Sequence, residues 1–456
     1  MPLQKNQVLT LRVERLSSDG SGVAHSPDGE TVFIPGAAPG DEARVRIVKD
    51  CKRYAFGILD EVLTPSPDRI PVDCAVAGPC GGCSLRHLDY AAELRAKQEN
   101  VADAFARIGG LDVPVLPIVG SPEVNRYRNK VQFPVGVDKS GKPCIGFYAG
   151  RTHRIVPCPD CRLQPGVLNE IGNALCAFFA EKGIQPYSEE TGRGLVRHIF
   201  LRRGAHSGQI MVCLVCTCAK LPCAEELCTR LKAQFAEITT ILLNVNAKNT
   251  NVILGTETHT LYGPGYIEDT LCGVPVQLGP LSFYQVNTLA AEQLYGIAAQ
   301  YAQLTPDDLL LDLYCGMGTI GLSMAAHCRE LIGVEIVPEA IESAKANAAR
   351  MGADVAAKSR FFCADAGQAA TRLAAEGLHP DIVMLDPPRK GCDEATLSAV
   401  VRMAPRRVVY VSCNPATAAR DAAWLEQNGY HAEKVQPVDL FPRTRHCECV
   451  LSFSKV

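Results

Sequence analysis

The chain has 456 residues, 47% of them hydrophobic, and a formal net charge of −3. This length suits about three domains with packed cores, and a charge near zero does not by itself indicate nucleic-acid binding. No apolar run approaches the ~18 residues of a membrane span, and no basic patch followed by an apolar stretch marks a secretory signal. We therefore expect a cytoplasmic protein that makes no contact with membranes.

The 21 cysteines need an explanation that fits this location. Thiols stay reduced in the cytoplasm, so cysteines there serve as core residues, metal ligands or nucleophiles. Most of them, such as Cys213, Cys216 and Cys218 in an apolar run, are expected to be small buried hydrophobic residues. Only a few require a chemical role.

Residues 8–62 consist of short runs in which apolar and polar residues alternate, separated by turn-forming clusters rich in Ser, Asp, Gly and Pro. This pattern predicts a small all-β, OB-like barrel, a fold that often binds oligonucleotides. Residues 1–62 resemble a TRAM domain, an RNA-binding barrel found at the ends of RNA-modifying enzymes. The alternative is a barrel that only packs against its neighbour.

A cysteine-rich loop follows, with the pattern Cys74-x5-Cys80-Gly-Gly-Cys83. Three thiols this close in sequence are hard to explain as core residues, and the glycine pair lets the backbone fold around a centre. A fourth thiol must come from farther along the chain, and Cys158 and Cys161 are the candidates. Four thiolates suit either zinc or an iron–sulfur cluster. The three-plus-one spacing favours the cluster, because zinc sites usually consist of two paired knuckles.

Residues 63–275 are expected to form a mixed α/β domain that contains this loop. A helix is predicted from about 88 to 108, and strands are predicted near 130–136, 195–203, 209–217 and 240–245. The segment Arg126-Tyr-Arg-Asn-Lys130 combines cations with an aromatic ring and is able to contact phosphates and stack on a base. The stretch 192–203 carries four arginines and no acid. The first segment is equally compatible with an ordinary strand entry, and the second with a solvated face paired with acids elsewhere, so we regard this domain as a substrate platform at most.

The last 180 residues alternate strands with helices, which predicts a doubly wound, Rossmann-like sheet. A glycine turn, Gly316-Met-Gly318-Thr-Ile-Gly321, follows the strand that contains Asp312. Later apolar runs end at Glu335, Asp365 and Asp386. Ligands of such sheets bind beyond the carboxyl ends of the strands, where these acids are expected to lie.

The glycine turn and Glu335 fit either a dinucleotide or S-adenosylmethionine, since both ligands use such a turn and an acid that binds ribose. Two features favour S-adenosylmethionine. Asp365 suits a hydrogen bond to an adenine amino group, and Asp386-Pro-Pro stiffens the exit of the next strand beside the methyl-donor position. Walker-type phosphate binding is excluded, because no Gly-Lys-Ser/Thr follows the turn.

Cys413 lies between an apolar run at 408–411 and a helix that Pro415 begins. A helix start favours the thiolate form of a cysteine. Such a thiolate suits methylation at a pyrimidine C5, because C5 is a poor nucleophile until a group adds to C6. This chemistry also needs a base to remove the C5 proton. Glu448, in the last predicted strand, is the candidate; the alternatives are His446 as the base, or a salt bridge from Glu448 to Arg443 or Arg445.

Six motifs together resemble the RNA 5-methyluridine methyltransferase family over nearly the whole chain. They are Cys74-x5-Cys80-Gly-Gly-Cys83, Ser282-Phe-Tyr-Gln285-Val-Asn287, Asp312-Leu-Tyr-Cys-Gly-Met-Gly318, Asp386-Pro-Pro-Arg389, Ser412-Cys-Asn-Pro415 and His446-Cys-Glu448. The chain is most similar to the 23S ribosomal RNA branch, which carries a TRAM domain and a [4Fe-4S] cluster. The transfer-RNA branch in bacteria typically lacks both.

The resemblance implies Cys413 as nucleophile and Glu448 as base. It implies S-adenosylmethionine contacts from Gln285, Tyr314, Thr319, Glu335, Asp365 and Asp386, where Thr319 replaces an asparagine of some members. It implies cluster ligation by Cys74, Cys80, Cys83 and Cys161, with Cys158 as the alternative fourth ligand. Residues 276–456 would form the class I methyltransferase domain.

We therefore expect a monomeric enzyme that transfers a methyl group from S-adenosylmethionine to C5 of an unstacked uridine in 23S rRNA, with no role for DNA and a structural cluster. The same reaction on tRNA is the first alternative. A non-catalytic RNA-binding assembly factor and an iron–sulfur redox enzyme that uses a nicotinamide are the others.

Overall fold

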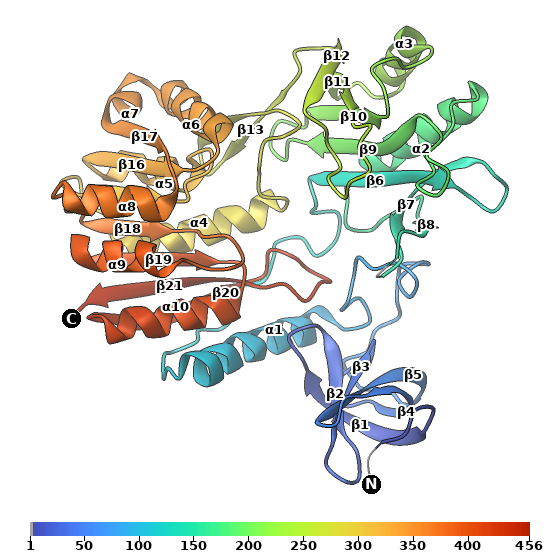
Figure 1. Ribbon diagram of the computed structural model, residues 1–456, viewed down its shortest axis with the longest axis horizontal. Helices are drawn as coiled ribbons and strands as arrows, with labels where there is room; N and C mark the ends of the chain where they lie inside the picture. The colour runs from blue at the N-terminus through green and yellow to red at the C-terminus, as the bar shows by residue number, and fades with distance from the viewer. Residues whose placement is uncertain (1–2, 151) are drawn as a thin grey trace.

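The computed structural model describes residues 3–150 and 152–456. It contains an N-terminal barrel and two large sheets, with a helix between the barrel and the C-terminal sheet (Figure 1). Within these described residues, no helix is both long and apolar enough to span a lipid bilayer.

The N-terminal strands form a closed barrel in the order β1-β2-β3-β5-β4. Their bounds are β1 Val8–Leu16, β2 Ser21–His25, β3 Thr31–Pro35, β4 Glu42–Asp50 and β5 Tyr54–Thr64. In β4 the side chains of Ala43, Val45 and Ile47 are buried and their neighbours are exposed, as the predicted alternation requires. The predicted OB-like barrel is confirmed.

Strand β2 starts within one of the turn-forming Ser/Gly-rich clusters, so the sequence pattern predicts a turn where the strand begins. Gly22 is needed there for close packing. A Cβ atom at this position would lie 2.8 Å from the side chain of Val13 on β1. The glycine that resembled a turn residue therefore allows two barrel strands to approach each other.

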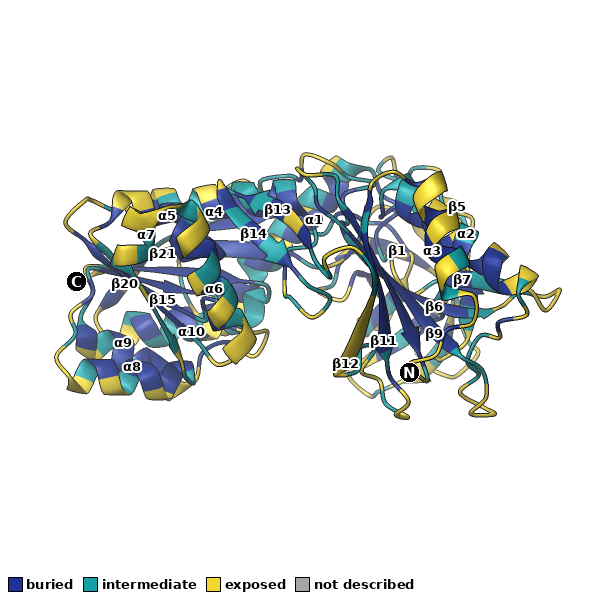
Figure 2. Cartoon of the chain, turned by 90° about the horizontal axis from the view of Figure 1, so that it is seen from above, coloured by how far each residue is buried: buried dark blue, intermediate teal, exposed yellow. Residues whose placement is uncertain are grey.

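The central sheet has seven strands in the order β12-β11-β10-β9-β6-β7-β8. The strands are β6 Lys130–Val137, β7 Pro143–Tyr148, β8 Ile155–Pro157, β9 Val196–Arg203, β10 Ile210–Cys216, β11 Ile238–Val245 and β12 Glu257–Tyr262, and the helices are α2 Gly166–Glu181 and α3 Ala224–Gln234. Its inner strands are buried and the edge strand β12 is exposed (Figure 2). Cys213 and Cys216 are buried on β10 as predicted, whereas Cys218 is exposed because the strand ends at Cys216.

One face of the central sheet packs on α2 and α3, and the other face joins the C-terminal part of the protein. Phe200, Met211 and Leu242 belong to the same buried cluster as the hairpin β13 (Ile267–Leu271) and β14 (Val274–Leu278). The central sheet therefore shares a continuous apolar core with the C-terminal sheet.

The helix predicted from 88 to 108 is α1, Tyr90–Ala104, extended by a π-helical turn at Phe105–Gly109. Asp89 caps it by accepting a hydrogen bond from the backbone N–H of Ala92 at 2.9 Å. Val101 and Phe105 are buried in the core of the C-terminal sheet. Helix α1 therefore belongs to the wall of that sheet, although it lies far from it in sequence.

The C-terminal sheet has seven strands in the order β17-β16-β15-β18-β19-β21-β20. Strand β21 runs antiparallel to β19 and β20, and all other neighbouring pairs are parallel. The strands are β15 Leu309–Leu313, β16 Glu330–Glu335, β17 Ser359–Cys363, β18 Ile382–Leu385, β19 Arg407–Ser412, β20 Tyr430–Val438 and β21 Glu448–Lys455. The helices are α4 Thr288–Ala302, α5 Thr319–Met324, α6 Pro338–Met351, α7 Ala353–Lys358, α8 Ala366–Ala375, α9 Glu394–Met403 and α10 Pro415–Gln427, with a 3₁₀ turn at Ala325–His327.

Both faces of this sheet are covered, which explains its nearly continuous apolar strands. In β15, Leu310 belongs to one buried cluster, and Leu309, Leu311 and Leu313 belong to the other. The predicted doubly wound, Rossmann-like fold is therefore confirmed.

Candidate active site

The carboxyl ends of the parallel strands meet at one edge of the C-terminal sheet, and the predicted site residues follow the strand order along it. In spatial order they are Asp365 after β17, Glu335 at the end of β16, Tyr314 after β15, Asp386 after β18, Cys413 after β19 and Glu448 at the start of β21. Because β21 is antiparallel, its first residue lies at the same edge. One edge thus collects residues from positions 314 to 448.

The glycine turn is tied to the neighbouring strand by Glu335. Its carboxylate accepts hydrogen bonds from the backbone N–H groups of Gly316 at 3.1 Å, Ile336 at 2.8 Å and Val337 at 3.0 Å. Gly316 and Gly318 have backbone φ angles of 55° and 79°, values that residues with a side chain rarely adopt. The turn therefore has a fixed shape beside a carboxylate.

Beneath this turn lies Asp312, whose carboxylate accepts a hydrogen bond from the Gly321 N–H at 3.0 Å. The other carboxylate oxygen is buried and has no hydrogen-bond partner. Burial raises the pKa of Asp312 to about 8, so this carboxyl is largely protonated at neutral pH.

Tyr295 on α4 connects three of the predicted cofactor residues. Its hydroxyl lies 3.3 Å from Thr319 Oγ1, also interacts with the side chain of Gln285, and is close enough to Asp386 to be affected by its charge. Sequence reasoning missed Tyr295, because it is one apolar-face residue of an ordinary amphipathic helix. The structure therefore brings Gln285, Thr319 and Asp386 together around a buried tyrosine.

Tyr314 and Asp365 lie farther along the same edge and make structural contacts of their own. The Tyr314 hydroxyl is 3.3 Å from Thr396 Oγ1 on α9, and the Tyr314 backbone has φ of 66°. Asp365 caps α8 by accepting a hydrogen bond from the Gln368 N–H at 3.1 Å. No contact links either side chain to the group around Tyr295 within the described residues.

Cys413 and Glu448 are neighbours across two antiparallel strands. Ser412 pairs with Cys449 in the β19–β21 register, so Cys413 and Glu448 are the next residues outward on each strand. Cys413 is half-buried and Glu448 is 6% exposed. Glu448 makes no ion pair with Arg443 or Arg445 in the described chain, and Arg443 instead pairs with Glu93 at 3.6 Å.

The surroundings of Cys413 disfavour its thiolate, although the residue lies at a helix start. Burial, followed by the nearby charges of Glu448 and Asp386, raises the pKa of Cys413 to about 11, and only Arg389 opposes this shift, by its charge and a hydrogen bond to the thiol. The sequence could not show that two carboxyls surround the sulfur. Sequence reasoning quoted Arg389 within the motif Asp386-Pro-Pro-Arg389 but assigned it no role.

The two carboxyls beside the sulfur hold protons unusually strongly. Burial raises the pKa of Glu448 to about 8 and that of Asp386 to about 7, with the mutual repulsion of the two carboxylates adding to the shift at Glu448. His446 has the opposite shift, since burial and nearby arginines lower its pKa to about 4. A base with so low a pKa accepts a proton weakly near neutrality, so the alternative base His446 is less suitable than Glu448.

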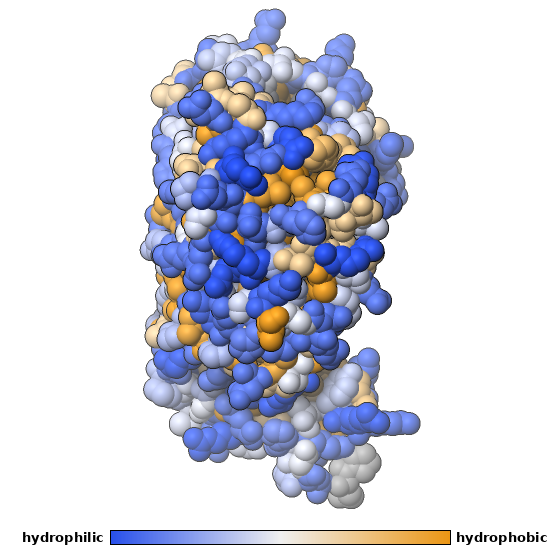
Figure 3. Space-filling view, turned by 90° about the vertical axis from the view of Figure 1, so that its left-hand side faces the viewer, coloured by the Kyte–Doolittle hydropathy of each residue, from blue (hydrophilic) through white to orange (hydrophobic). Residues whose placement is uncertain are grey.

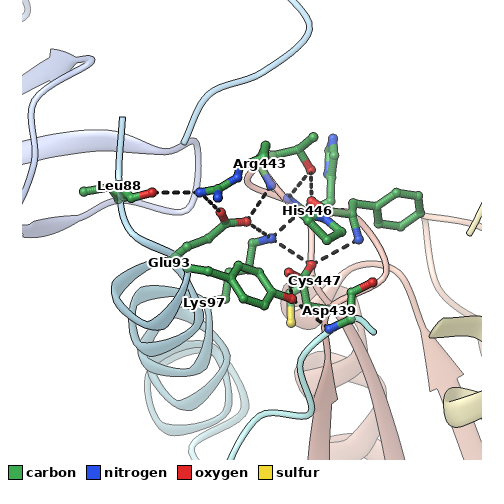
Figure 4. A network of polar contacts seen from close by, with 12 residues as sticks. Leu88, Glu93, Lys97, Asp439, Arg443, His446 and Cys447 are labelled. Atoms are coloured by element: carbon green, nitrogen blue, oxygen red, sulfur yellow. Dashed lines mark hydrogen bonds and ion pairs between the residues drawn. The ribbon is translucent and has the colours of Figure 1, made fainter. Parts of the chain in front are cut away.

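The loop that precedes Glu448 is fixed by a buried ionic network (Figure 4). Lys97 on α1 donates to Glu93 at 2.7 Å, to Asp439 at 2.8 Å and to the carbonyl of Phe441 at 3.2 Å. The Arg443 backbone N–H donates to Glu93 at 2.7 Å. Burial alone would lower the pKa of Lys97, but Asp439 and Glu93 outweigh it and raise the pKa.

Other segments hold the same loop. Asn287 of the Ser282–Asn287 motif donates to the Leu440 carbonyl at 3.1 Å, and Tyr127 donates to that of Pro442 at 3.0 Å. The Ser84 N–H, next to Cys83, donates to the Arg443 carbonyl at 3.0 Å. Contacts from the cysteine loop, from helix α1, and from Tyr127 and Asn287 therefore all position the strand that carries Glu448.

The predicted cysteine ligands line one cavity of about 580 Å³, together with Cys158, Arg389 and His446. The thiols of Cys80, Cys83 and Cys161 are close enough to affect one another's pKa. A Cβ atom at Gly81 would lie 3.2 Å from Gly150, so the loop packs tightly against the β7–β8 turn. In the described chain no three His, Cys, Asp or Glu side chains have the arrangement of a metal-ion site.

Cys158 and Cys161 differ in their surroundings. The Cys161 thiol accepts hydrogen bonds from Cys158 and from the backbone of Leu163 and Gln164, which lower its pKa, whereas the same interaction raises the pKa of Cys158. The backbone hydrogen bonds from Leu163 and Gln164 are specific to Cys161 and favour its thiolate. Cysteine thiolates are ligands of both zinc and iron–sulfur clusters, so the chemistry of these side chains allows either centre.

Comparison with known proteins decides the family. A family model described as tRNA (Uracil-5-)-methyltransferase matches residues 276–456, and a TRAM domain model matches residues 2–59. A relative from Halalkalibacterium halodurans named an uncharacterized RNA methyltransferase is 43% identical over 450 residues, with 98% of this chain and 97% of the relative covered. The chain belongs to the tRNA (uracil-5-)-methyltransferase family.

Other relatives agree with this family. A protein of Listeria monocytogenes named an uncharacterized RNA methyltransferase is 42% identical, with 98% of each chain covered. The crystal structure of Pyrococcus abyssi tRNA (uracil-54, C5)-methyltransferase in complex with S-adenosyl-L-homocysteine is 26% identical, has a TM-score of 0.78, and is matched over 98% of this chain and 100% of its own. The uracil-5-methyltransferase fold thus extends over the whole chain, and the protein is an S-adenosylmethionine-dependent RNA methyltransferase rather than a nicotinamide enzyme.

Proposed function

We propose that the protein methylates C5 of a uridine in 23S rRNA through a covalent bond between Cys413 and C6. The observation that carries this proposal is the placement of Cys413 and Glu448 on adjacent strands, directly after Asp386 along one sheet edge. An enzyme that methylates exocyclic amines needs neither a nucleophile nor a base at these positions, because the amine nitrogen carries its own lone pair.

The methyl donor would bind along the strands that precede Cys413 in the sheet. Glu335, on the strand next to the glycine turn, suits the ribose hydroxyls, and Asp365 suits the adenine amino group. Gln285, Tyr314, Thr319 and Asp386 complete the proposed set. The protonated fraction of Asp386 falls when a cation binds beside it, so the positively charged sulfur of the donor favours its carboxylate form.

The first step is addition of the Cys413 sulfur to C6. The thiol gives its proton to water, the sulfur forms a bond to C6, and the electron pair of the C5–C6 double bond moves towards the C4 carbonyl oxygen to give an enolate. Arg389 supports this step, because its charge and its hydrogen bond favour the thiolate. C5 then attacks the methyl group of S-adenosylmethionine, and S-adenosylhomocysteine leaves.

Glu448 completes the reaction. In its ionised form Glu448 removes the proton from C5, the electron pair of the C5–H bond re-forms the C5–C6 double bond, and the sulfur of Cys413 leaves C6 as a thiolate. Glu448 then passes the proton to water. A pKa near 8 gives Glu448 a stronger affinity for this proton than an exposed carboxylate has. The enzyme is thereby regenerated and 5-methyluridine is released.

We further propose that Cys74, Cys80, Cys83 and Cys161 hold a [4Fe-4S] cluster with a structural role. When bound, such a cluster would cross-link the cysteine loop to the 158–164 segment. Because the Ser84 N–H donates to the Arg443 carbonyl, a fixed cysteine loop would also hold the loop before Glu448 in place. Methyl transfer itself requires no electron carrier.

The other finer predictions remain proposals: a cytoplasmic location, a division into domains 1–62, 63–275 and 276–456, and a monomeric state. The face of the C-terminal sheet domain that Figure 3 shows is mainly hydrophilic, with apolar areas between the polar side chains.

Substrate choice separates two candidates. The TRAM domain and the cysteine loop support 23S rRNA, whereas the Pyrococcus abyssi structure with a TM-score of 0.78 is that of an enzyme named for uracil-54 of tRNA. Purified 23S rRNA and tRNA transcripts should be incubated with the enzyme and labelled S-adenosylmethionine. Label in 23S rRNA alone supports the proposal, and label in tRNA alone assigns the second candidate.

A further inference from the structure

Residues 126–130 connect the cysteine cavity to the proposed donor site. At one end the Arg126 guanidinium donates to the carbonyl of Cys161 at 2.9 Å. At the other end the Asn129 side chain donates to the carbonyl of Gln285 at 2.8 Å. The side chains between these anchors therefore lie between the cysteines and the proposed methyl-donor site.

Alternation along this extended segment divides its side chains between two sides. Tyr127 is 5% exposed and Asn129 is 4% exposed, and both make hydrogen bonds within the protein. Arg128 and Lys130 are the intervening residues, and both line the cavity of about 580 Å³. This cavity also contains Arg389, which contacts Cys413.

Apart from the cysteines, the charged side chains that line the cavity are mainly cationic. Its cationic side chains are Arg86, Arg128, Lys130, Arg162, Arg389 and Arg445, and its one carboxylate is Asp19. Asp73 pairs with Arg86 at 2.7 Å and with Arg162 at 3.7 Å. Within the described residues, Arg128 and Lys130 have no hydrogen bond or ion pair through their side chains.

The charged form of Lys130 is disfavoured in the free protein. Burial, together with repulsion from Arg202 and Arg128, lowers the pKa of Lys130 to about 8. Neighbouring unpaired cations in a cavity favour the binding of an anion that is able to contact both. An RNA backbone supplies two such anions at successive phosphates.

We propose that Arg128 and Lys130 bind consecutive phosphates of the substrate RNA next to the target uridine, so that this cavity holds the RNA backbone while the base enters the site at Cys413. This inference rests on the proposed function. Because phosphate contacts carry no sequence information, these residues would hold the RNA in register without selecting the uridine.

The competing explanation is that Lys130 compensates the charge of the proposed cluster. Arg86 already serves the cysteines in this way, because it forms a hydrogen bond to Cys83 and an ion pair with Asp73 at 2.7 Å. Lys130 has no comparable contact to a cysteine. RNA phosphate is therefore the better-supported partner.

The test measures binding of a short single-stranded oligouridylate by the full-length protein over a series of KCl concentrations, without methyl donor. For Lys130→Met and Arg128→Gln, affinity should fall several-fold, and the slope of log K against log salt should decrease by about 0.7 for each lost contact. Lys220→Met, which removes an exposed lysine outside the cavity, should leave the slope unchanged. Lys130→Arg keeps the positive charge, so its salt slope should equal that of the wild type.

Methyl transfer to 23S rRNA is measured separately in the same proteins, so the two proposals fail independently. A wild-type enzyme that methylates RNA, with Lys130→Met binding as wild type, would overturn the phosphate assignment alone. Loss of iron from Lys130→Met with an unchanged salt slope would also overturn it and support the cluster explanation. A changed slope in a protein that methylates no RNA would refute the proposed function and leave the phosphate contacts standing.

Discussion

Lys97 on α1 lies 2.8 Å from Asp439, which is 342 residues away in the chain and only nine residues before Glu448. Both side chains are almost fully buried. Glu93 and Arg443 complete the network, which therefore contains two cations and two carboxylates. It attaches an N-terminal helix to the loop that positions the proposed base.

Lys97→Met should destabilise the protein strongly, because it leaves Glu93 and Asp439 buried without their shared cation. Loss of one partner of a buried ion pair costs about 3–5 kcal/mol. Methyl transfer should also slow, by as much as about 100-fold if Glu448 moves by 1 Å. Urea unfolding and initial rates measure the two effects.

A double-mutant cycle with Asp439→Asn tests the coupling directly. The double variant should be less destabilised than the sum of the two single variants. Lys345→Met is the matched control, because Lys345 pairs with Glu342 on the exposed surface of α6 and should change stability by less than about 1 kcal/mol. Additive effects of Lys97 and Asp439 would contradict a shared network.

Glu448 should make the folded protein less stable as pH rises. Burial raises its pKa from 4.5 to about 8, so the folded state retains a proton that the unfolded chain has released. The stabilisation is complete below the unfolded pKa and is lost as pH rises towards 8. Glu448→Gln cannot titrate, so its melting temperature should fall less steeply than that of the wild type between about pH 5 and pH 8. Parallel curves in scanning calorimetry would contradict the buried neutral carboxyl.

Glu448→Gln should also separate methyl transfer from product release. The amide cannot accept the C5 proton, so the methylated uridine should stay bound to Cys413, and its release should slow about 100-fold or more. A protein–RNA band that resists denaturing electrophoresis and contains labelled methyl groups would show this. Turnover at the wild-type rate would assign the base to another group.

The C-terminal sheet and the order of residues along its edge could be predicted, because strand ends in a parallel sheet have a fixed location and the motifs mark each one. Gln285 and Thr319 were predicted from their motifs, but the Tyr295 hydroxyl between them was not, because packing between α4 and α5 decides it. The role of Lys97 could not be predicted either, because its partner Asp439 is 342 residues away in the sequence. The raised pKa of Cys413 depends on carboxyls from two other strands.

The cysteine assignment predicts unequal effects of two neighbouring substitutions. Cys161→Ser should reduce the iron and sulfide content of anaerobically purified protein sharply, because it removes the thiol that the surrounding hydrogen bonds favour as thiolate. Cys158→Ser should retain most of both. Elemental analysis and visible absorption measure the outcome; zinc alone in intact protein would refute the iron–sulfur assignment.

The central claim is that Cys413 bonds covalently to the uracil. RNA that contains 5-fluorouridine tests it most directly, because fluorine at C5 cannot leave as a proton does, and the adduct is trapped after methyl transfer. We predict a denaturant-resistant protein–RNA complex that requires S-adenosylmethionine, with the crosslink mapped to Cys413 by mass spectrometry and absent in Cys413→Ala. Full methylation of ordinary RNA by Cys413→Ala would contradict the account.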